Sequence, residues 1–276
     1  MRIDAHNHFW LFNKADYGWI DDSMALLRDD FTPQRFRKVL DAAGIDGTIA
    51  VQARQSLEET RWLLQLAEAN DFIKGVIGWV DLCSPQLQQQ LQEFEGCSKL
   101  KGFRHVLQDE PDDSFMLQPA FIDGIKLLAD IGYCYEILVF ARQLGAVQKL
   151  LQQLPQMRLV IDHIAKPDLK EHSSRNWFGD MHSISAYPNV YCKLSGMVTE
   201  ADWNNWNAKD IRPYIDHVIQ RFGGERVMFG SDWPVCLVAA DYLGVKALVE
   251  EYLNQHYPQF KNNIFGLNAS RFYQIR

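Results

Sequence analysis

Eight short apolar runs, rich in β-branched residues, recur along this 276-residue chain, and helical patterns separate most of them. Most of the runs are almost continuously apolar, which is typical of parallel strands covered on both faces. They are Arg2–Ala5, Gly47–Gln52, Gly75–Val80, Leu100–Arg104, Cys134–Val139, Leu159–Ile164, Val190–Leu194 and Arg226–Gly230. Eight strand–helix units in a chain of this length predict one α/β domain over residues 1–276, a (β/α)8 TIM barrel.

An open, doubly wound sheet is the competing fold for such an alternation. That fold lacks support because no Gly-rich phosphate loop follows the first run. The last apolar stretch, Ile264–Tyr273, predicts a C-terminal helix packed against the barrel.

The composition excludes several classes of protein. The net charge is −7 and no dense Lys/Arg cluster occurs, which argues against a nucleic-acid surface. No apolar run approaches eighteen residues, and the N-terminus has no secretion signal. The five cysteines are scattered and never form a CxxC pair, as expected for reduced thiols. We therefore expect a cytoplasmic protein without a nucleic-acid or membrane partner; the sequence leaves homo-oligomerisation open.

The first and last runs end in residues that suit a catalytic or metal site. Active sites of such barrels lie at the C-terminal ends of the strands. His6 and His8 share one face of an extended strand, with Asp4 below them. Two converging imidazoles suit a divalent metal or a pair of proton-transfer groups. Asp232 follows the last run, and closure of the barrel would bring it beside the two histidines.

The middle strands also end in polar residues. Asp162 and His163 would point to opposite faces of an extended strand, so we expect His163 in the lumen and Asp162 paired behind the strand. Arg104 and His105 pose the same alternative, which the sequence leaves open. An isolated buried histidine is more often a core residue than a ligand, but several histidines at strand ends together with an aspartate favour a functional site.

These residues resemble the amidohydrolase superfamily, and most closely its sugar-acid lactonase branch, the fuconolactonase- and rhamnonolactonase-like proteins, which are related to pyrone-dicarboxylate lactonase. The resemblance covers the whole chain in order. It rests on Asp4-Ala5-His6-Asn7-His8-Phe9-Trp10, Gly102-Phe103-Arg104-His105, Asp162-His163-Ile164-Ala165-Lys166-Pro167, Lys193-Leu194-Ser195-Gly196, Gly230-Ser231-Asp232-Trp233-Pro234-Val235 and Asn268-Ala269. It implies a hydrolase that opens a cyclic ester in carbohydrate catabolism.

The chain departs from the binuclear members of that superfamily. Those proteins bridge two metals with a lysine or glutamate on strand four and use histidines on strands five and six. Here the fourth run ends in Phe103-Arg104-His105, and the fifth has no histidine. The expected site therefore holds one divalent metal ion, zinc first among the candidates, or none.

Lactone hydrolysis needs a base for water, a polarised carbonyl and a proton for the leaving alkoxide. We assign the base to Asp232. His6 and His8 would hold a metal with Asp232 or, without metal, donate hydrogen bonds to the oxyanion. His163 would polarise the carbonyl or shuttle a proton.

The remaining candidates would bind the sugar lactone. Arg104 and Lys166 offer fixed positive charge for a carboxylate or polyhydroxyl group. Gln52 and His105 would bond hydroxyls, and Trp10 could stack on a sugar ring, although packing explains a tryptophan equally well.

Two other functions compete with the lactonase. A metal-dependent, non-oxidative decarboxylase of the same superfamily also uses an HxH strand and a terminal aspartate. A non-catalytic barrel that binds a sugar acid would be expected to have lost at least one of His6, His8, His163 and Asp232. All four are present, so this function is disfavoured.

Overall fold

The computed structural model describes residues 1–170 and 176–275 and contains one eight-stranded parallel sheet. Its strands follow one another in chain order, and each pairs with the next. They are β1 (Ile3–Asn7), β2 (Gly47–Val51), β3 (Ile73–Gly78), β4 (Leu100–His105), β5 (Cys134–Ile137), β6 (Leu159–Ile161), β7 (Val190–Leu194) and β8 (Val227–Phe229). The predicted (β/α)8 barrel is confirmed.

The first and last strands meet at their C-terminal ends. Asn7 forms a parallel bridge with Trp233, the N–H of His8 donates to the Trp233 carbonyl at 2.7 Å, and the N–H of Asp232 donates to the His6 carbonyl at 2.9 Å. Closure of the barrel therefore brings residues more than two hundred positions apart into direct contact.

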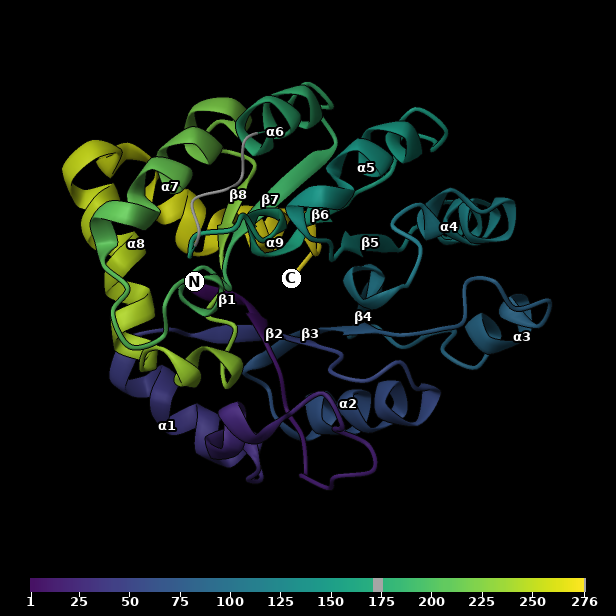
Figure 1. The fold of residues 1–276 in the computed structure, drawn as a ribbon. Helices are drawn as coiled ribbons and strands as arrows, with labels where there is room; N and C mark the ends of the chain where they lie inside the picture. Colours follow the sequence, from purple (N-terminus) through teal and green to yellow (C-terminus); the bar gives the residue numbers. More distant parts are fainter. Residues whose placement is uncertain (171–175, 276) are drawn as a thin grey trace.

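The helices follow one another around the strands in chain order, except for the last, which lies near the barrel axis (Figure 1). They are α1 (Pro33–Ala43), α2 (Leu57–Ala69), α3 (Leu87–Gln92), α4 (Pro119–Ile131), α5 (Leu144–Leu151), α6 (Trp177–Ser185), α7 (Ala208–Phe222), α8 (Tyr242–His256) and α9 (Asn268–Phe272). Local signals set their ends: the Ser56 hydroxyl accepts from the N–H groups of Glu58 and Glu59 at the start of α2, and Gly44, with a φ of 65°, caps the C-terminal end of α1.

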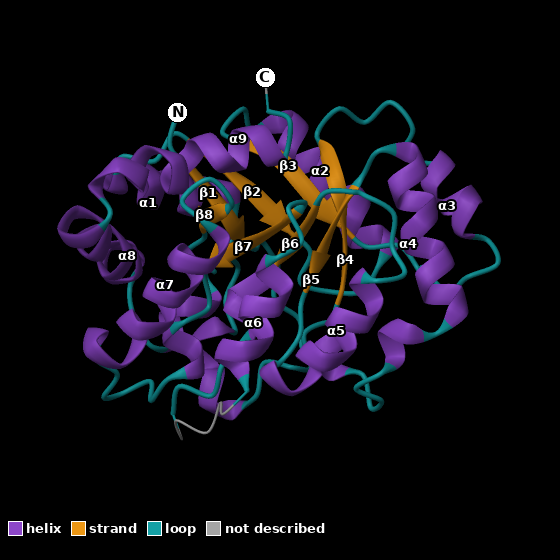
Figure 2. Cartoon of the chain, turned by 90° about the horizontal axis from the view of Figure 1, so that it is seen from above, coloured by secondary structure: helices purple, strands orange, loops and turns teal. Residues whose placement is uncertain are grey.

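The N-terminal end of the barrel is apolar and closed by the C-terminal segment. Figure 2 shows α9 and both chain termini on this side of the sheet. Phe272 and Tyr273 pack against inward-facing strand residues. Those residues are Ile3, Ala5, Ile49, Val51, Ile77, Cys134, Val160 and Met228. Apolar side chains therefore fill the barrel interior at this end.

Strand β6 is shorter than the predicted run Leu159–Ile164, and a tight turn follows it. Ile161 is its last residue, and His163, Ile164, Ala165 and Lys166 all have φ between 44° and 57°. This left-handed conformation costs about 1–2 kcal/mol per residue for L-amino acids. The Trp177 indole, which donates to the Ile164 carbonyl at 2.7 Å, helps to hold the turn. Strand alternation therefore does not apply to Asp162 and His163.

Two expectations from composition can be compared with the described residues. None of their helices is long and apolar enough to cross a membrane. All five cysteines lie in this part of the chain, and all are free thiols.

Candidate active site

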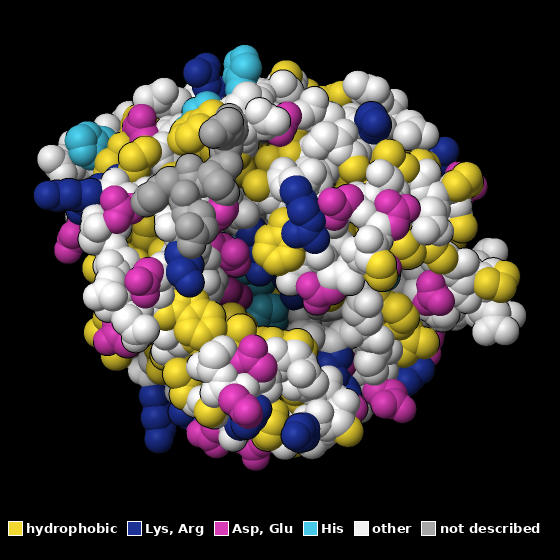
Figure 3. Space-filling view, in the orientation of Figure 1, with side chains coloured by type: hydrophobic (Ala, Val, Ile, Leu, Met, Phe, Trp, Pro, Cys, Tyr) yellow, Lys and Arg dark blue, Asp and Glu magenta, His cyan; other side chains and the backbone are white. Residues whose placement is uncertain are grey.

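The C-terminal ends of the strands open into a hollow. Figure 3 shows it at the centre of the face, with histidine side chains at its floor and acidic and basic side chains around it. The histidines that the strands bring to this end are His6 and His8, with His163 from the turn after β6. All three are almost completely buried.

Three donor atoms converge at the junction of the first and last strands. The Nε2 atoms of His6 and His8 are 3.2 Å apart. The Oδ1 atom of Asp232 lies 3.3 Å from His8 Nε2 and 3.9 Å from His6 Nε2. His8 Nδ1–H donates to the Val51 carbonyl at 2.8 Å, which leaves the His8 Nε2 lone pair directed at the group.

This group has the spacing of a metal site. Zinc bonds to His nitrogen and carboxylate oxygen at about 2.0–2.2 Å, so the donors of a tetrahedral site lie about 3.3–3.5 Å apart. The separations of 3.2 Å between the two imidazoles and 3.3 Å between His8 and Asp232 are close to that spacing, while the 3.9 Å between His6 and Asp232 is longer. Two imidazoles with one carboxylate make up a donor set found in catalytic zinc sites. His6, Asp162 and His163 form a second group of potential ligands, which shares His6.

His163 completes the floor of the hollow. Its Nε2 is 4.0 Å from Asp232 Oδ1, and its ring centroid is 4.4 Å from that of His6. The Ser195 hydroxyl, just after β7, contacts His163 Nδ1 at 2.9 Å. The next residue must be glycine, because a Cβ on Gly196 would lie 2.5 Å from the same nitrogen and the φ of Gly196 is 61°.

The charge states of these groups follow from their surroundings. Burial, together with the nearby cations, lowers the pKa of His6 well below its usual value despite Asp162. Burial likewise lowers the pKa of His163 well below its usual value. Burial alone would raise the pKa of Asp232, but the neighbouring histidines and Lys166 outweigh it and lower that pKa. Burial thus favours the neutral forms of His6 and His163 beside the Asp232 carboxylate.

Asp162 does not pair behind the strand, and that expectation was wrong. Its Oδ2 accepts from Arg104 Nη1 at 3.0 Å, and its Oδ1 lies 3.0 Å from Lys193 Nζ and 3.5 Å from His6 Nδ1. Asp162 and His163 both reach the interior because the backbone turns immediately after Ile161. Lys193 also contacts Glu136 Oε2 at 2.6 Å, so a buried network of charges lies directly below the histidines.

Arg104, rather than His105, faces this network. The Nε and Nη2 atoms of Arg104 donate to Gln52 Oε1 at 3.2 and 2.8 Å, and Nη1 lies 3.3 Å from His6 Nε2. Gln52 Nε2 is buried and has no hydrogen-bond partner among the described residues. His105 contacts Glu110 at 2.7 Å and stacks on Phe115, away from the histidine cluster.

The structure places the other two predicted substrate-binding residues differently. Lys166 lies in the turn after β6, where its Nζ pairs with Glu200 at 3.2 Å. Trp10 is fully buried, and its indole N–H donates to the carbonyls of Leu27 and Asp29 at 3.3 and 3.1 Å. Trp10 therefore packs the loop between β1 and α1, and neither it nor His105 joins the cluster.

Sequence reasoning assigned no function to Lys193, Glu136 or Ser195. Lys193 and Glu136 interrupt otherwise apolar strands, and both are fully buried. A charged residue within a buried strand needs a partner of opposite charge. The sequence therefore contained a signal that Lys193 and Glu136 pair with each other inside the barrel. Asp4 holds the backbone below the site, because its Oδ1 accepts from the backbone N–H groups of His6 and Ser231.

Comparisons with known proteins agree with this architecture. The model of the amidohydrolase family matches residues 3–275. The chain is 41% identical to a protein of Burkholderia multivorans named L-fucono-1,5-lactonase, over 100% of this chain and 96% of that protein. A protein of the same name from Burkholderia ambifaria is 35% identical over 100% and 96% of the two chains. The crystal structure of an amidohydrolase from B. multivorans with bound zinc is 40% identical, covers 100% of both chains and superposes with a TM-score of 0.96. This chain belongs to the amidohydrolase family.

Proposed function

We propose that the protein hydrolyses the ester ring of a small sugar-acid lactone. The observation that carries the proposal is the convergence of one carboxylate, Asp232, with three imidazoles in a hollow at the barrel mouth. A base and neutral hydrogen-bonding groups are what ester hydrolysis requires. The lactonase names of the relatives at 41% and 35% identity indicate the same chemistry.

In this mechanism Asp232 takes a proton from the attacking water. Its lowered pKa keeps it ionised at neutral pH but also makes it a weak base, so the water needs additional polarisation. A divalent ion, for which we propose zinc, would be held by His6, His8 and Asp232 and would polarise water or the carbonyl. His163 directs Nε2 toward Asp232 and would hydrogen-bond the carbonyl oxygen or return the proton to the leaving alkoxide.

Arg104, Gln52 and Lys166 would bind the substrate's oxygens. Arg104 holds Gln52 by its Oε1, which leaves the buried Nε2 available as a donor. A buried donor without a partner costs about 1–3 kcal/mol, and a substrate hydroxyl or carbonyl would remove that cost. Lys166 supplies positive charge from the turn beside His163.

The proposal is tested with a panel of fucono-, rhamnono-, galactono-, arabinono- and pyrone-dicarboxylate lactones, with acid release followed by a pH indicator. We expect hydrolysis of a sugar lactone and a loss of about 10²–10⁴-fold in kcat in Asp232→Asn. Asp123→Asn is the matched control, because Asp123 is exposed and pairs only with Lys126 among the described residues. Absence of hydrolysis across the panel would overturn the proposal, and release of CO2 from an aromatic acid would replace it with the decarboxylase.

The metal is tested on the same assay after chelation and after addition of Zn²⁺. Activity that falls on chelation and returns with Zn²⁺ supports the proposed ion. Activity unchanged in protein shown by elemental analysis to be metal-free would remove the ion from the mechanism and leave hydrogen bonding by the histidines.

A further inference from the structure

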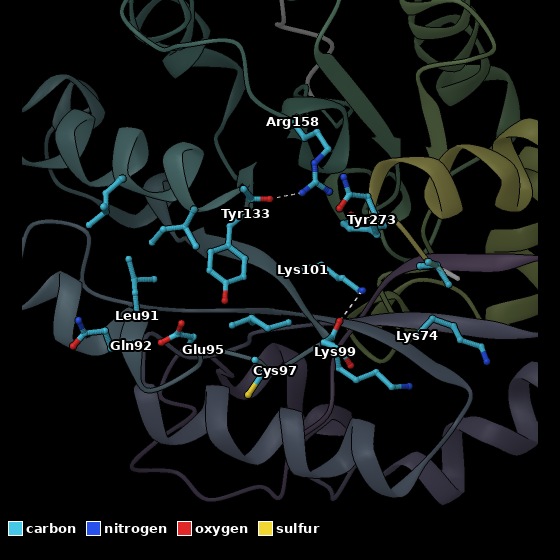
Figure 4. A pocket seen from close by; sticks show the side chains of 18 of the residues that line it. Lys74, Leu91, Gln92, Glu95, Cys97, Lys99, Lys101, Tyr133, Arg158 and Tyr273 are labelled. Carbon is cyan, nitrogen blue, oxygen red and sulfur yellow. Dashed lines mark hydrogen bonds between the residues drawn. The ribbon is translucent and has the colours of Figure 1, made fainter.

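A pocket of about 1080 Å³ opens at the N-terminal end of the barrel, on the side opposite to the histidine cluster. It lies between the C-terminal ends of α3 and α4, the first residues of β3 and β4, and the end of the chain (Figure 4). Ligand pockets usually measure about 300–1,000 Å³, so this one has room for a small metabolite.

The walls of the pocket carry more positive than negative charge. The acidic residues among them, Asp71 and Glu95, are both exposed to solvent. Four half-buried cations face these two carboxylates, namely Lys74, Lys99, Lys101 and Arg158. Because the chain as a whole has a net charge of −7, this local surplus of positive charge is a property of the pocket and not of the composition.

No carboxylate among the described residues forms an ion pair with Lys74, Lys99 or Arg158. Lys99 Nζ donates to the Ile73 carbonyl at 2.8 Å, and the Arg158 guanidinium donates to two backbone carbonyls. These bonds orient the side chains but do not neutralise them, and the ammonium group of Lys99 retains two further N–H groups. Partial burial of an unpaired cation costs free energy, which a bound anion would recover.

The cations at the barrel mouth differ in this respect. Lys166 pairs with Glu200 at 3.2 Å, and Arg104 pairs with Asp162 at 3.0 Å. The chain therefore supplies carboxylates of its own to the cations at the mouth. It supplies none to three of the cations in the pocket, which leaves their charge available to an external anion.

Two glycines allow the lysine side chains to lie across the starts of the strands. A Cβ on Gly47, in β2, would lie 2.7 Å from Lys74 Cγ, and a Cβ on Gly75, in β3, would lie 2.6 Å from Lys101 Cγ. Each lysine stem thus packs over a glycine of the preceding strand. Because this packing already restricts the stems, less side-chain entropy is lost when the ammonium groups bind an anion.

We propose that this pocket is an accessory site for a small anion that carries several carboxylate or phosphate oxygens. Lys74 and Lys99 bind the anion as point charges at the starts of β3 and β4, and Arg158 binds a further oxygen pair through its planar guanidinium. Arg158 also donates to the Phe272 carbonyl, so the bound anion connects these strands to the C-terminal segment. The site is separate from the proposed active site and does not depend on lactone hydrolysis.

Calorimetric titration with citrate and with inorganic pyrophosphate, at constant ionic strength, tests the site. We expect at least one of them to bind, and the tighter one identifies whether carboxylates or phosphates are preferred. In Lys74→Met/Lys99→Met, we expect the affinity to fall about tenfold or more, because two charge-assisted contacts are lost. Absence of binding by both anions would overturn the proposal, and so would wild-type affinity in the folded double variant.

Lys38→Met/Lys149→Met is the matched control, because it removes the same charge from exposed positions on α1 and α5, outside the pocket. We expect wild-type affinity in this variant. An equal loss of affinity in both double variants would show that the anions respond only to the overall charge and would overturn the site. Glu95→Gln should have the opposite effect and strengthen binding, since it removes a negative charge from the pocket wall.

Two cysteines give a second measurement on the unmodified protein. Both thiols are half-buried, but Cys97 lines the pocket and Cys83 does not. At an anion concentration of ten times Kd, we expect alkylation of Cys97 by iodoacetamide to slow about tenfold by mass action, and alkylation of Cys83 to keep its rate. Peptide mass spectrometry measures both rates. An unchanged rate at Cys97, or equal slowing of both thiols, would overturn the site.

Discussion

The Ser195 hydroxyl lies 2.9 Å from Nδ1 of His163 and also accepts from the His163 backbone N–H at 3.3 Å. One side chain from the end of β7 therefore holds both the ring and the backbone of a histidine whose turn has a left-handed conformation. The orientation of His163 toward Asp232 depends on this contact between neighbouring strand ends.

Replacement of Ser195 by alanine should leave the His163 imidazole in the site but remove the hydroxyl that orients it. We expect kcat on the sugar lactone to fall by up to about tenfold, the equivalent of one neutral hydrogen bond, while KM changes little. Steady-state kinetics measure this. Ser183→Ala removes an exposed hydroxyl that donates to Gly179 and should leave kcat unchanged. Equal kcat in Ser195→Ala and wild type would show that the ring needs no such support.

Gly196→Ala should damage both folding and activity. The new Cβ would lie 2.5 Å from His163 Nδ1, and alanine is strained at a φ of 61°. We expect the free energy of unfolding to fall by about 1–3 kcal/mol and kcat to drop at least tenfold.

Gly132→Ala is the control for Gly196→Ala, because it adds the backbone strain of a positive φ without displacing His163. Gly132 ends α4 with a φ of 94°, and an added Cβ would meet no atom within 4 Å. This variant should lose only about 1 kcal/mol of stability, seen by denaturant unfolding, and keep its kcat. Full activity in Gly196→Ala would contradict the close packing of His163.

Arg104→Lys should act as a severe substitution although the charge is kept. Only a guanidinium can contact Gln52 Oε1 through two nitrogens and Asp162 through a third. We expect kcat/KM to fall about 10–100-fold, the cost of losing charge-assisted hydrogen bonds. Arg142→Lys, at an exposed pair with Asp113, is the matched control and should change nothing. Wild-type kcat/KM in Arg104→Lys would show that the simultaneous contacts of the guanidinium with Gln52 and Asp162 are not needed.

The buried carboxylate Glu59 should make stability depend on pH. Its Oε2 accepts from the N–H groups of Ala53 and Arg54, but burial still raises its pKa to about 7. Because the folded-state pKa lies above the unfolded value, the folded protein holds the proton more tightly. The free energy of unfolding therefore decreases as pH rises from about 4.5 to 7, by about 3 kcal/mol from this group.

Glu59→Gln tests this dependence. The variant keeps an oxygen acceptor for the two N–H groups but cannot ionise, so its stability should exceed the wild-type value increasingly from pH 5 to pH 8. Urea unfolding at several pH values measures the difference. A difference that stays constant across this range would contradict the raised pKa.

The sequence by itself determined the barrel and the chemistry at its mouth. Eight apolar runs separated by helical patterns specify parallel strands, since only strands covered on both faces bury so much apolar surface. In a barrel these strands all end on one face, so His6, His8 and Asp232 could be expected together from their positions alone. The C-terminal helix could be expected for a similar reason, because an apolar stretch must find a surface to cover.

Only the tertiary structure decided which neighbouring side chains face inward. Strand alternation predicted opposite directions for Asp162 and His163, but the left-handed turn after Ile161 brings both to the interior. Such a turn is stabilised by its surroundings and leaves no mark in local propensity. The choice between Arg104 and His105 likewise depends on distant partners, Gln52 and Asp162 for the arginine and Glu110 for the histidine.

The contact of Lys193 with His6 and Glu136 also required the fold. Each of these residues comes from a different strand, and Glu136 and Lys193 are each the single charged residue of their strand. Their interaction exists because the closed barrel brings three strands to one axis and excludes water from it. Local sequence encodes the strands; the burial that makes these charges depend on one another is a property of the closed barrel.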